Sequence, residues 1–324
     1  MPYSVETVRQ ARQILAQKKA DRESEYREHL QNAYQQLPRL RQIDGDLRRS
    51  MALAAQTAFT KGEDARQTME SIKDANLALQ QERQRLIAEN FPKNYLNETP
   101  ICSLCGGSGY IGTNMCRCLS ELCRQAQKDA LSLLTTGKER FENFRLDVYS
   151  DRIDPRYKVS PRAIMERNFQ LCRRYAEGFE PGCGSLLFVG GTGLGKTFLS
   201  ACIADVVTDK GYSIAYESAP HLFAKLEKNR FNPDEQSRAA VSQLENCDLL
   251  IIDDLGTEMP GSFVTAALYS LVNDRLLAKK NMIISTNLLV EELGKRYSPQ
   301  IASRLQGSFR GLTFVGEDVR IRRI

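Results

Sequence analysis

Apolar residues follow two different patterns along the chain, and the change comes near residue 95. Before it, single apolar residues recur at helical spacing among many Gln, Arg, Glu, Lys and Ala residues. After residue 180, short apolar runs are separated by stretches with helical spacing. The first pattern is typical of amphipathic helices, and the second predicts strands that alternate with helices.

Residues 1–97 are predicted to form a helical, coiled-coil-like region. Pro38 and a Lys61–Gly62 turn divide it into three stretches, because proline and glycine interrupt helices. In the stretch from Glu63 to Asn90 the apolar residues recur every seven positions. They are Ile72, Leu79 and Leu86. These helices are too polar for a large core, so we expect a hairpin or small bundle, which fits either a solvated structural element or a partner-docking module.

Five apolar runs in residues 181–324 predict an α/β domain, with a parallel sheet between two layers of helices. The runs are Ser185–Val189, Ser213–Glu217, Leu249–Asp253, Asn281–Thr286 and Leu312–Val315. Residues 125–180 are expected to be a connector of helix and loop. In such a sheet, ligands bind at the carboxyl ends of the strands.

The run SLLFVGGTGLGKT, residues 185–197, contains a phosphate-binding loop pattern, G-x-x-x-x-G-K-[ST]. The glycines let backbone N–H groups converge on phosphate oxygens, and the following helix adds the positive end of its dipole. We expect Lys196 to bind the β and γ phosphates of ATP and Thr197 to bind Mg²⁺. The predicted nucleotide-binding residues are Gly190, Gly191, Thr192, Gly193, Leu194, Gly195, Lys196, Thr197 and Phe198.

A later strand is predicted to end in two carboxylates, Asp253 and Asp254, after four apolar residues. This is a Walker B pattern. We expect Asp253 to hold Mg²⁺ opposite Thr197, and Asp254 to orient or deprotonate the attacking water.

Asn287 follows the next strand, where a side chain that senses the γ-phosphate is expected. Ser285 and Thr286 are less favoured for that role. An asparagine that only caps the segment Leu288–Leu293 also fits the position.

A C-x-x-C pair and, ten residues later, a C-x-C pair lie in residues 98–124. Four thiolates suit a closed tetrahedral Zn²⁺ site. An iron–sulfur cluster is the main alternative, and a redox pair is disfavoured because no thioredoxin-like βαβ pattern surrounds it. Cys123 is a less favoured fifth candidate. The predicted metal ligands are Cys102, Cys105, Cys116 and Cys118.

Composition limits the remaining choices. The 324 residues allow two or three domains. No apolar run approaches the ~20 residues of a membrane span, and the N-terminus has no signal-peptide pattern, so we expect a cytoplasmic protein without a membrane partner. A net charge of +5 permits contact with nucleic acid without requiring it. Packed thiols are expected at Cys172, Cys183, Cys202 and Cys247.

The ordered set GGTGLGKT, LLIIDDLG, ISTN, IASRL and GEDVR resembles the AAA+ replicative helicase loaders of the DnaC/DnaI type. The N-terminal helices, CSLC…CRC and RFENF resemble the Firmicute and phage-like branch of that family. The resemblance covers nearly the whole chain, although before residue 98 it lies only in the general composition and helical pattern and not in motifs. It implies a P-loop AAA+ ATPase that binds a hexameric replicative helicase through its N-terminal region and helps to place it on single-stranded DNA.

The resemblance also implies roles for single residues. Lys196 with Thr197 matches Walker A, and Asn287 matches sensor 1. Arg304, in IASRL, matches the box VII arginine, which reaches a neighbouring subunit's ATP and so implies self-association through a shared site. Arg320, in GEDVR, matches a sensor 2 residue. Many AAA+ proteins have Glu where this chain has Asp254, a departure that points to slow hydrolysis.

Three functions fit these patterns. The first is a helicase loader whose ATP hydrolysis is slow and depends on assembly. The second is an IstB-type transposition helper, which shares the ATPase core, binds DNA and acts with a transposase; the cysteine cluster favours the loader. The third is an adaptor whose nucleotide site is only a switch. A kinase or GTPase is disfavoured because no N-K-x-D follows the Walker B strand.

Three basic residues are candidates for DNA contact, although they also fit a solvated helix face. They are Lys225, Lys228 and Arg230.

Overall fold

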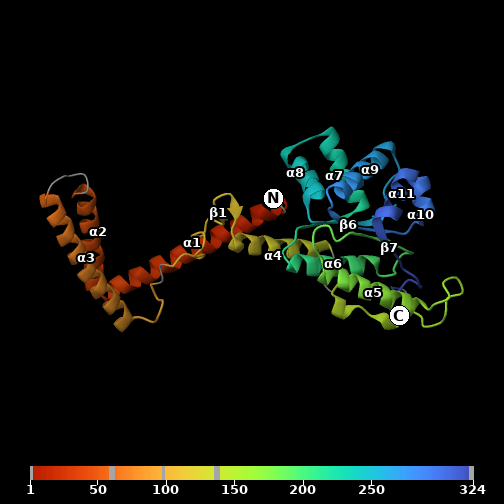
Figure 1. Cartoon of the computed structure of the whole chain (residues 1–324). Coiled ribbons are helices and arrows are strands. Elements are labelled where there is room, and N and C mark those ends of the chain that lie inside the picture. Colours follow the sequence, from red (N-terminus) through yellow and green to blue (C-terminus); the bar gives the residue numbers. More distant parts are fainter. Residues whose placement is uncertain (1–2, 58–62, 97–98, 135–138, 321–324) are drawn as a thin grey trace. The chain divides into compact units, whose positions relative to one another are not determined.

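The computed structural model describes residues 3–57, 63–96, 99–134 and 139–320 (Figure 1). The chain divides into two compact units. One unit spans Ile14–Cys116, and the other joins the described residues up to Gln13 with those from Arg117 onward. The predicted domain boundaries at residues 97, 124 and 180 stay predictions.

Long helices form most of the first unit. The helices are α1 (Val5–Gln36), which enters this unit at residue 14, α2 (Pro38–Thr57) and α3 (Glu63–Asn90). Figure 1 shows α2 and α3 side by side as a hairpin. The break at Pro38 is as predicted, whereas the predicted Lys61–Gly62 turn lies outside the described residues.

One carboxylate links the three helices. Asp44 on α2 accepts hydrogen bonds from the Tyr34 hydroxyl at 2.7 Å and from Arg83 Nε at 2.8 Å. Burial and the neighbouring Asp44 raise the pKa of Tyr34 to about 12. Leu40, one turn before Asp44, and Ile43, directly before it, are fully buried. The small apolar core of the hairpin is therefore joined to a polar network that fixes the helices.

The second unit is built on a five-stranded parallel sheet with strand order β4-β5-β6-β3-β7. The strands are β3 (Ser185–Val189), β4 (Ile214–Ser218), β5 (Leu249–Leu255), β6 (Asn281–Thr286) and β7 (Phe309–Thr313). The predictions for β3 and β6 are confirmed to the residue. Strand β4 lies one residue later than predicted, and β5 is two residues longer.

The prediction for the last strand was wrong in its bounds. Strand β7 begins at Phe309, three residues before the expected start, and ends at Thr313. Phe309 is buried and pairs in register with Ser185 of β3. Pairing with a central strand therefore extends the backbone through Arg310 and Gly311, which have no apolar pattern of their own.

Helices cover both faces of the sheet (Figure 1). On one face lie α5 (Pro161–Glu177) and α6 (Lys196–Asp209), and α4 (Arg117–Leu134) packs against α6. The other face is covered by α7 (Ala219–Phe231), α8 (Glu235–Asn246), α9 (Ser262–Leu277), α10 (Val290–Arg296) and α11 (Pro299–Ser308). None of the helices in the described part of the chain combines the length and apolar character that a membrane span requires.

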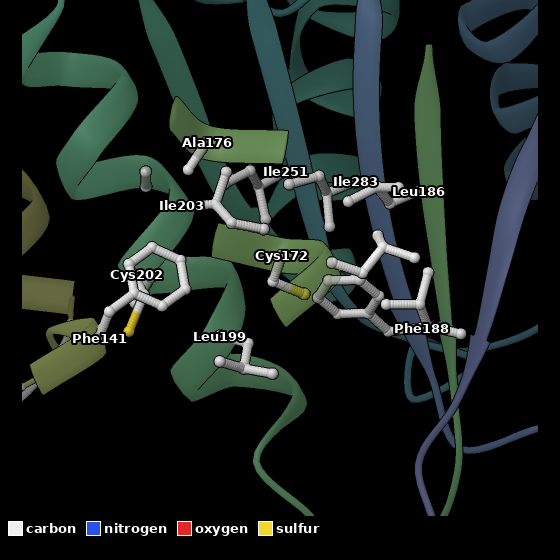
Figure 2. Packing of buried hydrophobic residues seen from close by; sticks show 14 of the residues in the cluster. Phe141, Cys172, Ala176, Leu186, Phe188, Leu199, Cys202, Ile203, Ile251 and Ile283 are labelled. Carbon is white, nitrogen blue, oxygen red and sulfur yellow. The ribbon is translucent and has the colours of Figure 1, made fainter. Parts of the chain in front are cut away.

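Successive strand residues point to opposite layers, as the pleat requires. Leu186 and Phe188 pack toward α5 and α6, and Leu187 packs toward the other layer. Figure 2 shows Cys172 of α5 and Ile203 of α6 against the first of these faces. The strands read as continuous apolar runs because both faces are covered.

The expected packed thiols are confirmed at Cys172, Cys202 and Cys247, which are buried. The prediction was wrong for Cys183, which is exposed in the turn before β3. A glycine on each side of Cys183 leaves that turn without bulky neighbours to cover the thiol.

Arg275 of α9 is a buried cation that the sequence did not reveal, with only 1% of its surface exposed. Its guanidinium donates to the backbone oxygens of Leu244 at 2.8 Å, Cys247 at 3.1 Å and Asn281 at 2.7 Å. Burial lowers its pKa. Arg275 thus ties α8 and the amino ends of β5 and β6 into one layer.

Candidate nucleotide site and cysteine cluster

The glycine-rich loop begins where β3 meets the end of β7. The Gly190 N–H donates to the Thr286 oxygen at 3.2 Å, and Gly190 has φ 157. A Cβ at this position would lie 2.4 Å from the Phe314 carbonyl oxygen, closer than atoms can approach. The loop therefore starts against the main chain of its neighbour, and only glycine fits there.

Lys196 is the first residue of α6 and is almost completely buried, with 3% of its surface exposed. Its Nζ donates to the carbonyl oxygens of Gly190 and Gly191, both at 2.7 Å, and to Asn287 Oδ1 at 2.6 Å. Burial lowers the pKa of Lys196, and the charges of Asp254 and Asp253 act in the opposite direction.

Asn287 directly follows β6 and lies beside Lys196, although the two residues are 91 positions apart. It does not cap the next helix. Helix α10 begins at Val290 and its N-cap residue is Leu289, and the Asn287 side chain instead accepts a hydrogen bond from Lys196. The capping alternative for Asn287 was therefore wrong.

Asp253 lies on β5 between two hydroxyl donors. Tyr216 of β4 donates to its Oδ2 at 3.2 Å, and Ser285 of β6 donates to its Oδ1. Burial, with the neighbouring Asp253 as a further cause, raises the pKa of Tyr216 well above its usual value. The sequence missed the supporting roles of Tyr216 and Ser285. The available signal was a polar side chain in each strand that flanks the carboxylates.

Asp254 lies at a bulge, where the pairing of β5 with β6 shifts register between Ile252 and Leu255. Its backbone is left-handed, with φ 54, and its N–H donates to Ser285 Oγ at 2.9 Å. Bulges redirect side chains, and such φ values in non-glycine residues cluster at active sites. Burial, and then the charge of Asp253, raises the pKa of Asp254.

The rest of the loop is covered by the RFENF segment and its continuation. The Tyr149 hydroxyl donates to the Leu194 oxygen at 3.0 Å, and the Phe144 ring lies 5.6 Å from that of Phe198. Thr192 and Thr197 are exposed. The Thr197 hydroxyl and the Asp253 carboxylate are oxygen ligands of the kind that Mg²⁺ prefers.

The segment GEDVR also reaches the loop. The Val319 N–H donates to the Gly193 oxygen at 3.1 Å, and Gly193 has φ 68. Arg320 pairs with Asp318, Nη2 to Oδ2 at 2.8 Å, and this partner lowers the pKa of Asp318 to about 2. The structure thus brings Arg320 to the loop. The described contacts of Arg304, in contrast, are with α9.

A cavity of about 550 Å³ opens beside the loop. Gly190, Leu194 and Asn287 line it, together with residues of the 148–157 segment and the chain that follows β7. Cavities of this size hold small molecules and cofactors. Two glycines of the loop and Asn287, which accepts a hydrogen bond from the buried Lys196, therefore border a space large enough for a small molecule, whereas Asp253 and Asp254 are not among the residues that line it.

The four predicted cysteine ligands are brought together. Their sulfur atoms all lie within 4.8 Å of one another, and those of Cys102 and Cys116 are 3.7 Å apart. Four thiolates at 2.3 Å from zinc lie roughly 3.8 Å apart, so the spacing suits that metal. The Gly109 N–H donates to Cys105 Sγ at 3.3 Å. Cys123 is outside the cluster; it is buried, and burial raises its pKa to about 11.

Comparison with known proteins finds similarity in the part of the chain that contains the glycine-rich loop and the two carboxylates. Residues 182–303 match the family model of the IstB-like ATP binding protein. This part of the chain is therefore similar to IstB-like ATP-binding proteins. The predicted resemblance to replicative helicase loaders is also confirmed, since several proteins similar in sequence are named replicative helicase loader DnaC.

The replicative helicase loader DnaC of Escherichia coli K12 is 25% identical over 134 residues, which cover 41% of this chain and 55% of that protein. DnaC of Buchnera aphidicola from Acyrthosiphon pisum is 24% identical over 187 residues, 56% and 72% of the two chains. A putative insertion sequence ATP-binding protein of Sinorhizobium fredii is 30% identical over 106 residues, 33% and 34%. The chain therefore spans about half the length of the Escherichia coli relative.

Among solved structures, the DnaC helicase loader has a TM-score of 0.45 at 21% identity and covers 54% of this chain and 98% of its own. The DnaI structure has a TM-score of 0.42 at 20% identity, with coverages of 47% and 85%.

We expect Gly190→Ala to lower ATP affinity at least about tenfold, which corresponds to about 1.4 kcal/mol. The new methyl group would displace either the loop or the chain after β7. Gly311→Ala on β7 is the matched control, because its Cβ would meet nothing within 4 Å and the residue lies outside the loop. Calorimetric titration with ATP and Mg²⁺ measures both. Equal affinities would contradict this account of the loop.

We expect about one zinc ion per chain, and its loss in Cys105→Ser, because three thiolates do not close a tetrahedral site. Cys183→Ser, which removes an exposed thiol outside the cluster, should keep the metal. Elemental analysis of protein purified under reducing conditions tests this. Iron with a visible absorption band would instead identify an iron–sulfur cluster.

Proposed function

We propose that this chain is a helicase loader, a slow ATPase that helps to place a hexameric replicative DNA helicase on single-stranded DNA. The observation that carries the proposal is the meeting of Lys196, Asn287 and the Asp253–Asp254 pair at one end of the sheet. Similarity to replicative helicase loaders supplies the biological class. We assign the protein to the cytoplasm.

In the proposed reaction, the ammonium of Lys196 binds the β and γ phosphates in place of loop carbonyl oxygens, and Thr197 and Asp253 hold Mg²⁺. Asp254 takes the proton of the water whose oxygen bonds to the γ-phosphorus, while the bond from that phosphorus to the β–γ bridging oxygen breaks and ADP leaves. The raised pKa of Asp254 makes it a stronger base, and its redirected backbone aims the carboxylate. Asn287 and Arg320 contact the phosphate groups. The IstB-type transposition helper shares this core, and the match to that family keeps it as the second candidate.

The α2–α3 hairpin is the proposed docking site for the helicase. Met51, Leu53 and Leu77 are exposed on it. A groove of about 720 Å³ lined by Ala54, Ile72 and Leu77 lies between the helices. Exposed apolar surface of this kind marks interaction sites in soluble proteins.

Capture by the full-length chain tests the function and separates the two candidates. A replicative helicase should be recovered from the host lysate, and Leu77→Asp should reduce recovery because it places a charge in the groove. Leu277→Asp changes an equally exposed leucine on α9 and should have no effect. Recovery of a transposase in place of a helicase would replace the loader by the transposition helper.

Single-stranded DNA is proposed to bind at the carboxyl end of α7. Lys225 and Lys228 are paired with Glu217 and Asp234, so the solvated-face interpretation fits these two lysines. A separate aromatic–basic group lies beside them. It consists of Arg230, over the ring of Phe263 at 6.0 Å, and Phe231, which is 63% exposed and 5.9 Å from the same ring. Exposed aromatic rings with a guanidinium are the platform on which unpaired bases stack.

We expect Phe231→Ala to weaken binding of a short oligo-dT strand by about 1–3 kcal/mol, the usual value of one stacked base. Lys225→Ala is the control, because this lysine is already neutralised by Glu217. Fluorescence anisotropy with ATP and Mg²⁺ present measures both. A larger loss in the lysine variant than in the phenylalanine variant would place the DNA elsewhere.

A further inference from the structure

Arg304 of α11 lies in a cradle made by α9. Its Nε and Nη2 donate to Asn273 Oδ1 at 3.1 and 2.8 Å, and its guanidinium carbon lies 4.6 Å from the centre of the Tyr269 ring. Tyr269 and Asn273 are four residues apart on the helix and so share one face. The planar guanidinium is therefore held both at its edge and on its flat face.

Both partners of Arg304 are neutral, as are the backbone oxygens that hold Arg275, whereas two other arginines of this unit pair with carboxylates. Arg296 pairs with the buried carboxylate of Glu258, and Arg320 pairs with Asp318. Among the described contacts of Arg304 there is no carboxylate. Two of its five N–H groups point to Asn273, and three are left for another acceptor. The side chain is thus fixed in place while its charge is not neutralised.

We propose that Asn273 and Tyr269 are positioning residues that hold Arg304 ready for the phosphate groups of ATP bound to a second copy of this chain. The inference rests on the proposed ATPase function and on the shared ATP site that the family resemblance of Arg304 implies. Preorganised cations stabilise developing phosphate charge best when nothing must be displaced or reordered during the reaction. A carboxylate partner would compete with the phosphate for the guanidinium, whereas an amide oxygen and an aromatic ring do not neutralise it.

The test measures ATP hydrolysis by the full-length chain at rising protein concentration with single-stranded DNA. Asn273→Asp changes few atoms but places a carboxylate against Arg304, and it should lower the assembly-dependent kcat about tenfold or more. KM for ATP and self-association should stay unchanged. Ser270→Asp, which adds the same charge at an exposed position of α9, is the matched control and should behave like the unaltered chain.

The aromatic partner is tested by a conservative pair. Tyr269→Phe keeps the ring and should keep the rate, and Tyr269→Leu keeps an apolar side chain but loses the ring's attraction for the cation and should lower kcat. A purely structural role for the position would give the opposite order or no difference. Full assembly-dependent rates in both Asn273→Asp and Tyr269→Leu would contradict the proposal that these two residues position Arg304.

A mixing experiment separates positioning from misfolding. Asn273→Asp keeps its own ATP pocket, and Asp254→Asn keeps an intact Arg304, so the mixture should recover part of the activity that each lacks alone. Co-assembly without recovery would overturn the inference. The proposed shared site has its own control, Arg304→Ala. If that variant keeps the full assembly-dependent rate, the shared site itself is wrong, whatever Asn273→Asp does.

Discussion

The parallel pairing of β3, β5 and β6 is the constraint on which the candidate site depends. Val189 pairs with Thr286, and Ile252 pairs with Ile284, so the three strands end at one edge. The glycine-rich loop after β3, the carboxylates of β5 and Asn287 after β6 therefore lie at the same edge, although they are far apart along the chain. The helices on both faces keep this register, because a slip by one residue would move each apolar side chain to the wrong layer.

Charged groups of both signs act on one another at this edge of the sheet. One buried ammonium group lies among two carboxylates, and each carboxylate has a different environment. Asp253 accepts hydrogen bonds from two hydroxyl groups, whereas burial, and then the charge of Asp253, raises the pKa of Asp254. The pair thus resembles other sites in which neighbouring acids perform separate tasks, one binding a cation and the other moving a proton.

Local patterns in the sequence predicted what is local in the structure. Strands β3 and β6, the helix break at Pro38 and the grouping of the four cysteines follow from apolar runs, proline chemistry and ligand spacing. Strand β7 was misplaced because its pairing with β3 stabilises residues without a strand pattern. The roles of Tyr216 and Arg275 were missed for a related reason. Tyr216 donates to a carboxylate on a neighbouring strand, and Arg275 donates to backbone oxygens of other elements. The spacing of residues along the sequence does not show which of these groups will lie close together.

The left-handed backbone at Asp254 restricts which amino acids this position accepts. Aspartate and asparagine adopt positive φ far more readily than most residues, because their short polar side chains can bond to nearby main-chain groups. A longer acid would extend the reach of the carboxylate, but it would lack that local compensation. The main chain at this step of the strand thus favours a short acidic side chain over a long one.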